Sequence, residues 1–280
     1  ISASFLKKLK SIHPLLCHSH FGPDSVYALR VSQALNIPLI VTFHGYDATT
    51  LNAPSPTNTF KQKLYFNNKH ELIKQTHLFI AVSEFVKNKL IAQGYPPAKI
   101  RVHSIGIDTL IFKPNPTIKR QEMILFVGRL VEKKGCTYLI EALRILNRSK
   151  IKLVIIGDGP LRQNLEKQAM NATIDASFLG HQTNLQVKVW MMKAKLLCVP
   201  SITAENGDAE GFGMVFAEAQ ALGTPVVSFQ SGGIPESVQN FKTGLLAAEK
   251  DIDLLSEYIN KLLTDNQLWL EYSDAGKSRV

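Results

Sequence analysis

The chain has 280 residues, of which 45% are hydrophobic and 20% charged, and its net charge is +9 at pH 7. This composition agrees with a folded α/β protein and excludes a membrane-spanning one, because no apolar run is long enough to cross a bilayer. The three cysteines are far apart and lie in apolar surroundings, which favours a reducing compartment. We therefore expect a cytoplasmic protein.

Predicted strands alternate with predicted helices along the chain, and a Pro-rich break at 111–117 separates two such series. We place the domain boundary there, giving domains 1–115 and 116–280. The first carries 13 Lys and Arg against 5 Asp and Glu, a net charge of +8, whereas the second carries 19 against 18. A basic first domain suggests peripheral contact with an anionic membrane surface, at the inner face of the membrane, or a generally solvated basic surface. Nucleic acid is disfavoured because the Lys residues are scattered and no aromatic residues interleave with them.

The first elements are a basic helix at 5–12 and a short strand at 16–21. That strand contains His18 and His20, a His-x-His spacing that could hold a metal ion, but no third ligand of suitable spacing follows. We therefore expect no metal. The next buried strand, at 37–43, ends in His44 and a glycine; such a histidine is more often structural than functional.

The second domain opens with a hydrophobic strand whose following loop presents Arg129 and Lys134. A guanidinium and an ammonium in such a loop can clamp and neutralise a pyrophosphate. The alternative is a solvated Lys pair, and we expect Lys133 to be solvated.

A second strand and turn, at 151–160, contain Gly157 and Gly159, which resemble part of a dinucleotide-binding fingerprint. The match is weak: Arg162 occupies the position of the third glycine, and the acid expected further on, Asp175, follows no obvious strand end. An NAD-dependent oxidoreductase is therefore the least favoured function.

Residues 210–218 set two carboxylates eight positions apart around a Gly-Phe-Gly turn. Gly211 and Gly213 allow close approach of the backbone to a ligand, and a helix beginning near Gly213 would direct free N–H groups at a diphosphate. Glu210 in the loop and Glu218 inside the helix could then bind hydroxyls on the two sides of the phosphates, as in a nucleotide sugar. The alternative is an ordinary helix start with solvated acids.

The surroundings favour the ligand site. A buried strand at 196–201 precedes the motif, and a helix stop with another strand follows at 223–227. This order puts the acids at the carboxyl edge of a parallel sheet. Asp208 could add a sugar contact or simply form a turn, and Asp251 reads as a helix cap rather than a metal ligand.

Together these segments resemble the retaining glycosyltransferases of the GT-B fold, family 4, with their E-x7-E motif, and the sequence ahead of the motif is similar to enzymes of exopolysaccharide and colanic-acid assembly. The resemblance implies two Rossmann-like domains with parallel sheets facing a cleft. It also implies a metal-independent hexosyltransferase without a cofactor, acting on a nucleoside diphosphate sugar and on a saccharide or lipid-linked acceptor.

The resemblance also assigns roles to residues. Arg129 and Lys134 would hold the diphosphate, Glu210 the donor sugar and Glu218 the ribose, while His44 would face the sugar or the departing phosphate. Further donor contacts would come from strand ends and from the motif: Gly157, Gly159, Gly180, His181, Asp208, Gly211, Phe212, Gly213 and Met214.

Two alternatives stay open. Nucleotide-sugar 2-epimerases share the fold and the donor chemistry, and a catalytically inactive nucleotide-sugar-binding module would keep donor recognition alone. Family members usually begin with a strand and Gly-rich turn and end with a terminal helix, so we expect the first domain to lack its first strand and the second its last helix.

Overall fold

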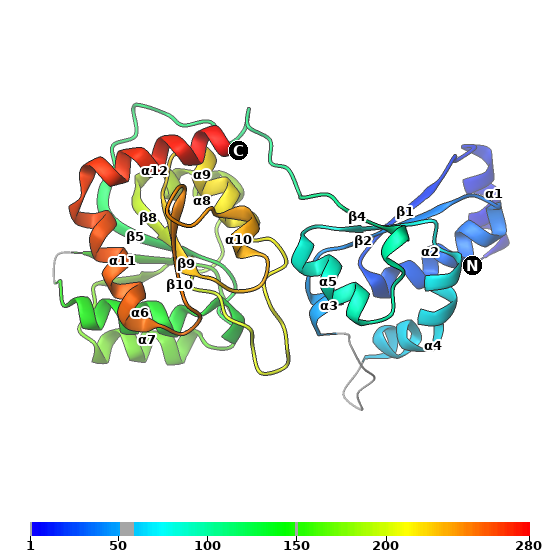
Figure 1. The fold of residues 1–280 in the computed structure, drawn as a ribbon, viewed down its shortest axis with the longest axis horizontal. Helices are drawn as coiled ribbons and strands as arrows, with labels where there is room; N and C mark the ends of the chain where they lie inside the picture. Colours follow the sequence, from blue (N-terminus) through cyan, green and yellow to red (C-terminus); the bar gives the residue numbers. More distant parts are fainter. Residues whose placement is uncertain (1, 51–58, 149–150) are drawn as a thin grey trace. The chain divides into compact units, whose positions relative to one another are not determined.

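The computed structural model describes residues 2–50, 59–148 and 151–280, which form two compact units with one parallel sheet each (Figure 1). Unit 1 comprises Ile1–Ile105 and Glu205–Phe212, and unit 2 comprises Gly106–Ala204 and Gly213–Val280. The division falls at Ile105, before the Pro-rich segment at which we placed the boundary. It also assigns to unit 1 a short segment from the second half of the chain, which the sequence did not indicate.

The sheet of unit 1 has four parallel strands in the order β1-β2-β3-β4. The strands are β1 (Cys17–His20), β2 (Leu39–Phe43), β3 (Leu78–Ala81) and β4 (Ile100–Val102). β1 and β2 confirm the strands predicted at 16–21 and 37–43. The side chains of β2 are buried apart from the half-buried Ile40, whereas His18 and His20 of β1 are exposed.

Helices connect these strands and pack on them. They are α1 (Ala3–Ser11), α2 (Gly22–Leu35), α3 (Tyr46–Thr49), α4 (Phe60–Gln75) and α5 (Glu84–Ala92), with a 3-10 turn at Pro97–Lys99. α2 packs against α4, β1 and β2. Local signals set the helix ends: Thr59 and Gln62 form a capping box at the start of α4, and Asn36 ends α2 in the left-handed conformation.

The sheet of unit 2 has six parallel strands in the order β10-β9-β8-β5-β6-β7. They are β5 (Gln121–Val127), β6 (Lys152–Ile156), β7 (Ala176–Phe178), β8 (Ala194–Cys198), β9 (Val226–Phe229) and β10 (Gly244–Ala247). This is the doubly wound order, in which the chain starts at the centre, builds outward to one edge and then returns to build the other. The strands predicted at 196–201 and 223–227 are confirmed.

Helices cover both faces of this sheet, with α6, α7 and α11 together on one side and α8, α9 and α12 on the other (Figure 1). They are α6 (Cys136–Leu146), α7 (Arg162–Asn171), α8 (Asn184–Lys193), α9 (Met214–Ala221), α10 (Ile234–Ser237), α11 (Ile252–Thr264) and α12 (Asn266–Arg279), with a 3-10 turn at Glu132–Lys134. Asp251 caps α11 by accepting a hydrogen bond from the Leu254 amide at 3.0 Å, which confirms its predicted role.

Candidate functional site

The strand order of unit 2 places its switch point between β5 and β8, where the chain direction across the sheet reverses. In open α/β sheets, ligands bind outside the carboxyl ends of the strands at this point. The loop after β5 carries Arg129 and Lys134, and the loop after β8 leads towards the Glu210 to Glu218 motif. The structure therefore brings the predicted phosphate-binding loop to the binding edge of the sheet.

The loops after β5 and β8 pack directly on each other. The Ile202 amide donates to the Lys133 carbonyl at 2.8 Å, and a Cβ on Gly135 would lie 1.8 Å from the Pro200 carbonyl oxygen. Gly135 has φ +66°, so both its conformation and its surroundings require glycine. This contact fixes the short turn that holds Lys134.

The two predicted phosphate ligands differ in their surroundings. Arg129 is exposed, whereas Lys134 is half-buried and its aliphatic stem runs over Gly128, with Cδ 3.4 Å from the position of a Cβ there. Lys133, which we expected to be solvated, is instead buried and makes contacts of its own. That expectation was wrong because the loop after β8 covers this residue.

The structure shows why residues 157 and 159 are glycines, which the sequence did not show. A Cβ on Gly157 would lie 2.0 Å from the Gly128 carbonyl oxygen, and one on Gly159 would lie 2.5 Å from that of Leu130. The turn after β6 thus packs backbone against backbone on the loop after β5. These glycines let the two loops meet at the carboxyl edge of the sheet.

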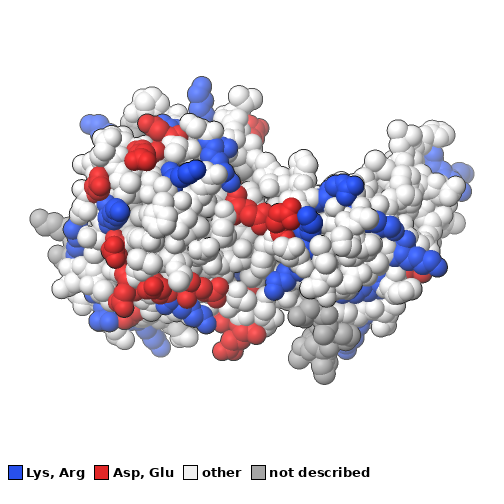
Figure 2. Space-filling model, viewed as in Figure 1, with Lys and Arg blue, Asp and Glu red and all other residues white. Residues whose placement is uncertain are grey.

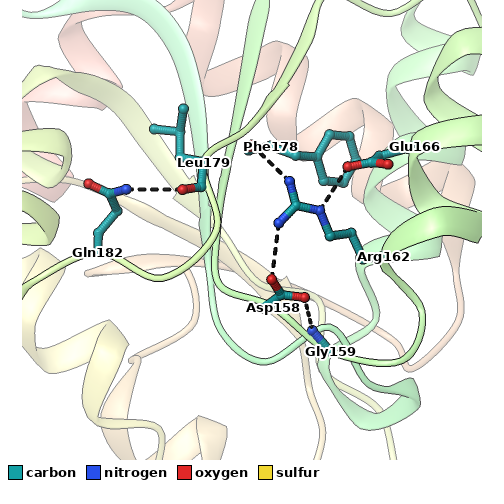
Figure 3. A network of polar contacts seen from close by, with 7 residues as sticks. All are labelled: Asp158, Gly159, Arg162, Glu166, Phe178, Leu179 and Gln182. Atoms are coloured by element: carbon teal, nitrogen blue, oxygen red, sulfur yellow. Dashed lines mark hydrogen bonds and ion pairs between the residues drawn. The ribbon is translucent and has the colours of Figure 1, made fainter.

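A network of polar contacts joins the turns after β6 and β7 (Figure 3). The Arg162 guanidinium bonds to the Asp158 carboxylate at 3.0 Å and the Glu166 carboxylate at 2.8 Å, and donates to the Phe178 carbonyl at 3.4 Å. Asp158 also accepts from the Gly159 amide at 2.7 Å; this bond and Arg162 lower the pKa of Asp158.

Two further contacts shape the turn after β7. Gln182 donates to the Leu179 carbonyl at 3.0 Å (Figure 3), and the Gly157 amide donates to the Gly180 carbonyl at 2.8 Å. Gly180 has φ +64°, and His181 beside it is exposed and close enough to Asp158 to lower the pKa of that carboxyl. Gly157, Gly159, Gly180 and His181 therefore lie at neighbouring strand ends, as the sequence predicted.

α9 begins at Met214 with Gly213 as its N-cap, in the left-handed conformation with φ 83°. Only glycine adopts this conformation without strain, so the second glycine of the motif sets the start of the helix. Glu218 lies on this helix and is half-buried, and burial raises the pKa of its carboxyl. Groups with shifted pKa values cluster at functional sites.

The rest of the motif belongs to unit 1. Asp208, Glu210, Gly211 and Phe212 lie in the segment Glu205–Phe212, and Phe212 packs against the core of that unit. The Asp208 amide donates to the Asn206 side chain at 2.9 Å, which is the turn chemistry considered as the alternative for this stretch. The predicted donor residues are thus divided between the two units, with Glu210 in one and Glu218 in the other.

His44 follows β2 in unit 1, where it contacts two other aromatic side chains. His20 at the end of β1 places Nδ1 2.9 Å from His44 Nε2, and the Phe21 ring centroid lies 4.6 Å from that of His44. Burial, and then the neighbouring His20 and His18, lower the pKa of His44. The neutral ring is favoured, and one of the two bonded nitrogens carries the shared proton.

Asp47 was missed by the sequence reading. Its carboxylate is fully buried and accepts from the amides of Gly22 at 3.0 Å, His44 at 3.1 Å and Gly45 at 3.0 Å. It therefore fixes the turn after β2 against the start of α2. The sequence signal available for this role of Asp47 was its place at a helix start, two residues after a His-Gly pair.

Two features of the described residues bear on other functions. Among residues 2–50, 59–148 and 151–280, no group of three His, Cys, Asp or Glu side chains could hold a metal ion, and the rings of His18 and His20 lie 4.6 Å apart. Within the same described part of the chain, no helix is both long and apolar enough to cross a membrane.

Comparison with known proteins decides the family. The sequence profile of "Glycosyl transferases group 1" matches residues 108–279, and that of "Glycosyltransferase Family 4" matches residues 2–109. The chain belongs to the glycosyl transferases group 1 family. The resemblance seen in its motifs is confirmed.

Two relatives of this group 1 chain are bacterial. It is 32% identical over 251 residues to an amylovoran biosynthesis glycosyltransferase of Erwinia amylovora, covering 87% of this chain and 60% of the relative. It is also 32% identical over 249 residues to a Salmonella typhimurium protein named for colanic acid biosynthesis, covering 85% of this chain and 59% of the relative. The chain thus spans about 60% of the length of these relatives.

Solved structures confirm the fold of this family member. An Anabaena protein solved with UDP superposes with a TM-score of 0.81 at 21% identity, covering 99% of this chain and 76% of that protein. With its two parallel sheets and flanking helices, the chain has the predicted α/β architecture of GT-B glycosyltransferases.

Proposed function

We propose that this chain is the core of a retaining glycosyltransferase that transfers a sugar from a nucleoside diphosphate sugar to a saccharide or lipid-linked acceptor in cell-surface polysaccharide synthesis. One observation carries the proposal: the loop with Arg129 and Lys134 lies at the switch point of the unit 2 sheet, and the helix with Glu218 follows the neighbouring strand. Family membership and the names of the relatives agree with it.

The proposed chemistry follows from the charges. As the bond between the sugar and the diphosphate breaks, negative charge develops on the leaving oxygen and positive charge on the sugar ring. Arg129 and Lys134 would stabilise the leaving diphosphate, which makes a divalent metal unnecessary. Glu218 would bind the ribose hydroxyls, Glu210 would bind the donor sugar, and His44 would face the sugar or the departing phosphate. Retention would follow from departure and attack on the same face of the sugar.

The direct test is calorimetric titration of the chain with UDP, GDP and ADP in the presence of a chelator. We expect binding of one nucleotide, weakened at least ten-fold by Arg129→Ala and by Glu218→Ala. Matched controls are Arg144→Ala and Glu271→Ala, which remove exposed charges on α6 and α12 of the same unit. Failure of the folded wild-type chain to bind any nucleotide would contradict the proposal.

The same preparation separates transfer from isomerisation. A glycosyltransferase releases nucleoside diphosphate when an acceptor or water is present, whereas a 2-epimerase interconverts donor epimers without releasing it. Chromatography of the nucleotide products distinguishes the two. A chain that binds nucleotide and does neither would match the inactive binding module.

We further propose that unit 1 contacts an anionic membrane surface. Among the charged side chains on its visible face, Lys and Arg predominate, whereas unit 2 shows both signs (Figure 2). α1 carries Lys7, Lys8 and Lys10, has no buried residue, and exposes Phe5. Basic side chains of this kind attract anionic lipid in a salt-dependent manner.

Co-sedimentation with vesicles tests the membrane contact. We expect binding to phosphatidylserine-containing vesicles at low salt, loss of binding at high salt, and weaker binding after Lys7, Lys8 and Lys10 are changed to Gln. Equal binding to neutral and anionic vesicles at low salt would refute the contact.

A further inference from the structure

We propose that Ser83 and Gly45 form a socket in unit 1 that holds the segment Glu205–Phe212, and that Ser83 is thereby a positioning residue for Glu210. The two residues lie far from this segment in sequence. The part of the inference that concerns the donor sugar rests on the proposed function of Glu210.

Ser83 makes the most direct contact with the segment. Its side chain is fully buried, and Oγ donates to the Gly211 carbonyl at 2.6 Å. The same oxygen accepts from the Val86 amide at 3.1 Å, which makes Ser83 the N-cap of α5. A hydroxyl has a single proton to donate, and here it is directed at the residue that follows Glu210.

The second half of the socket is a contact between two glycines. A Cβ on Gly211 would lie 2.2 Å from the His44 carbonyl oxygen, and a Cβ on Gly45 would lie 3.2 Å from the Cα and N atoms of Gly211. Gly45 also has φ +142°. Close packing therefore requires glycine both in the His-Gly pair after β2 and at the first position of the Gly-Phe-Gly turn. Any side chain at either position would separate the two backbones.

Contacts on both sides of Glu210 hold the rest of the segment. The Thr49 hydroxyl lies 3.5 Å from the Asp208 carboxylate, and Ala209 is buried. After Glu210, Gly211 is in the socket and Phe212 packs against the core of unit 1. Since the residues before and after Glu210 are anchored, the direction of its main chain is fixed by unit 1.

The two acids of one sequence motif are therefore held in place by different units. Its second acid, Glu218, is fixed by α9 of unit 2, whereas its first acid, Glu210, is placed by side chains and glycines of unit 1. Loosening the socket should therefore weaken recognition of what Glu210 binds and leave recognition of the nucleotide unaffected.

Hydrogen exchange measured by mass spectrometry tests the socket without any ligand. In Ser83→Ala we expect amide exchange in 205–212 to be roughly ten-fold faster than in the wild type, as a lost buried hydrogen bond predicts. Ser83→Thr keeps the hydroxyl and should restore slow exchange. Thr59→Ala removes the N-cap of α4 in the same unit and should leave 205–212 unchanged. Unchanged exchange in Ser83→Ala would refute the socket.

Calorimetry tests the positioning of Glu210. The probes are UDP with UDP-glucose and GDP with GDP-mannose. The quantity compared is the gain in affinity from the sugar, which is the affinity for the nucleotide sugar divided by the affinity for the nucleotide alone. We expect Ser83→Ala to reduce this gain at least five-fold with nucleotide affinity unchanged, and Ser83→Thr to recover it. Faster exchange with an unchanged gain would refute the positioning role.

The exchange and calorimetry experiments also distinguish failure of this inference from failure of the proposed function. If the wild type binds neither these four probes nor ADP, the proposed function fails, and with it the proposed role of Glu210. The exchange experiment still decides whether Ser83 holds the segment. A general loss of nucleotide and sugar affinity in Ser83→Ala would indicate a merely structural residue and would overturn the positioning role.

Discussion

Glu218, which has a proposed role in binding, lowers the stability of the folded protein when its carboxyl is charged. It is half-buried on α9, and burial raises the pKa of its carboxyl. A group whose pKa is raised in the folded state contributes its full share of stability below its unfolded-state pKa and loses it as the pH rises through the folded-state value. At neutral pH the charged Glu218 is therefore unfavourable for folding, as expected of a residue kept for binding.

We expect Glu218→Gln to be more stable than the wild type at pH 8 and equally stable at pH 4, because Gln has no charge to bury. Its nucleotide affinity should fall. Urea unfolding at the two pH values checks the first statement and calorimetry the second. Glu271→Gln, on the exposed face of α12, is the control for removal of an acid from the surface of the same unit. Equal stability of Glu218→Gln and wild type at pH 8 would contradict the expectation.

Burial also makes a negative charge on Asp47 unfavourable for folding, and it does so more strongly than at Glu218. Burial raises the pKa of Asp47 to about 6, while hydrogen bonds from the backbone amides of Gly22, Gly45, His44 and Asp47 itself oppose that shift. Its contribution to stability is therefore complete below the ordinary carboxyl pKa and is lost as the pH rises through about 6. The turn bearing His44 and Gly45 depends on this carboxyl.

Asp47→Asn should destabilise the protein by about 1–3 kcal/mol at pH 5, because the Asn amide group cannot accept from the Gly22 N–H. The deficit should shrink at pH 8, where the wild type pays the cost of a buried charge and the variant does not. Urea unfolding of both proteins at pH 5 and pH 8 measures the difference. A deficit that grows with pH would show that Asp47 is charged and favourable in the folded state.

At the scale of elements, Arg162 on α7 ties the turn after β6 to the end of β7 (Figure 3). Its ion pairs are substantially exposed, so they add little to stability. Their effect is geometric: they fix the position of two turns that carry four of the predicted donor residues.

Arg162→Gln should therefore leave the melting temperature almost unchanged and weaken binding of the cognate nucleoside diphosphate, while binding of pyrophosphate stays as in the wild type. Arg144→Gln is the matched control, since Arg144 also pairs with an acid on its own helix, Glu141, but lies on α6. Calorimetry with both probes checks the outcome. Equal weakening of pyrophosphate binding would place the effect at the phosphates instead.

At the scale of the whole molecule, each unit has its own hydrophobic core, and among the described residues no buried one belongs to both cores. Within unit 2, Arg120 joins several elements: its guanidinium donates to the carbonyls of Met191, Ala194, Leu222 and Gly223 and to the Thr224 hydroxyl, and lies 5.3 Å from the Trp269 ring. Burial lowers the pKa of Arg120 to about 10.

Arg120→Ala leaves four carbonyl groups without this donor and should destabilise unit 2 by about 2–4 kcal/mol. Because the cores are separate, exchange protection of β2 and β3 in unit 1 should change less than that of β5 and β8. Hydrogen exchange of the full chain measures both units at once, and Arg144→Ala should change neither. Equal loss of protection in the two units would show that they unfold as one.

The sequence alone predicted the alternation of strands and helices and several of the strands, and the resemblance of its motifs gave the Rossmann-like fold and the family. It also determined which residues follow which strand ends, including Arg129, Lys134, His44 and Glu218. The reason is that periodicity, glycine positions and helix caps act over a few residues, and parallel strands then bring their carboxyl ends to one edge.

Only the tertiary structure decided which distant groups meet. Ser83 and Gly211 are 128 residues apart, His20 lies beside His44 from another strand, and Lys133 is buried by a loop that follows β8. No local pattern encodes these pairs, because each depends on how two segments with separate local signals pack. The assignment of Glu205–Phe212 to unit 1 has the same cause, since buried contacts rather than sequence neighbours determine where a loop belongs.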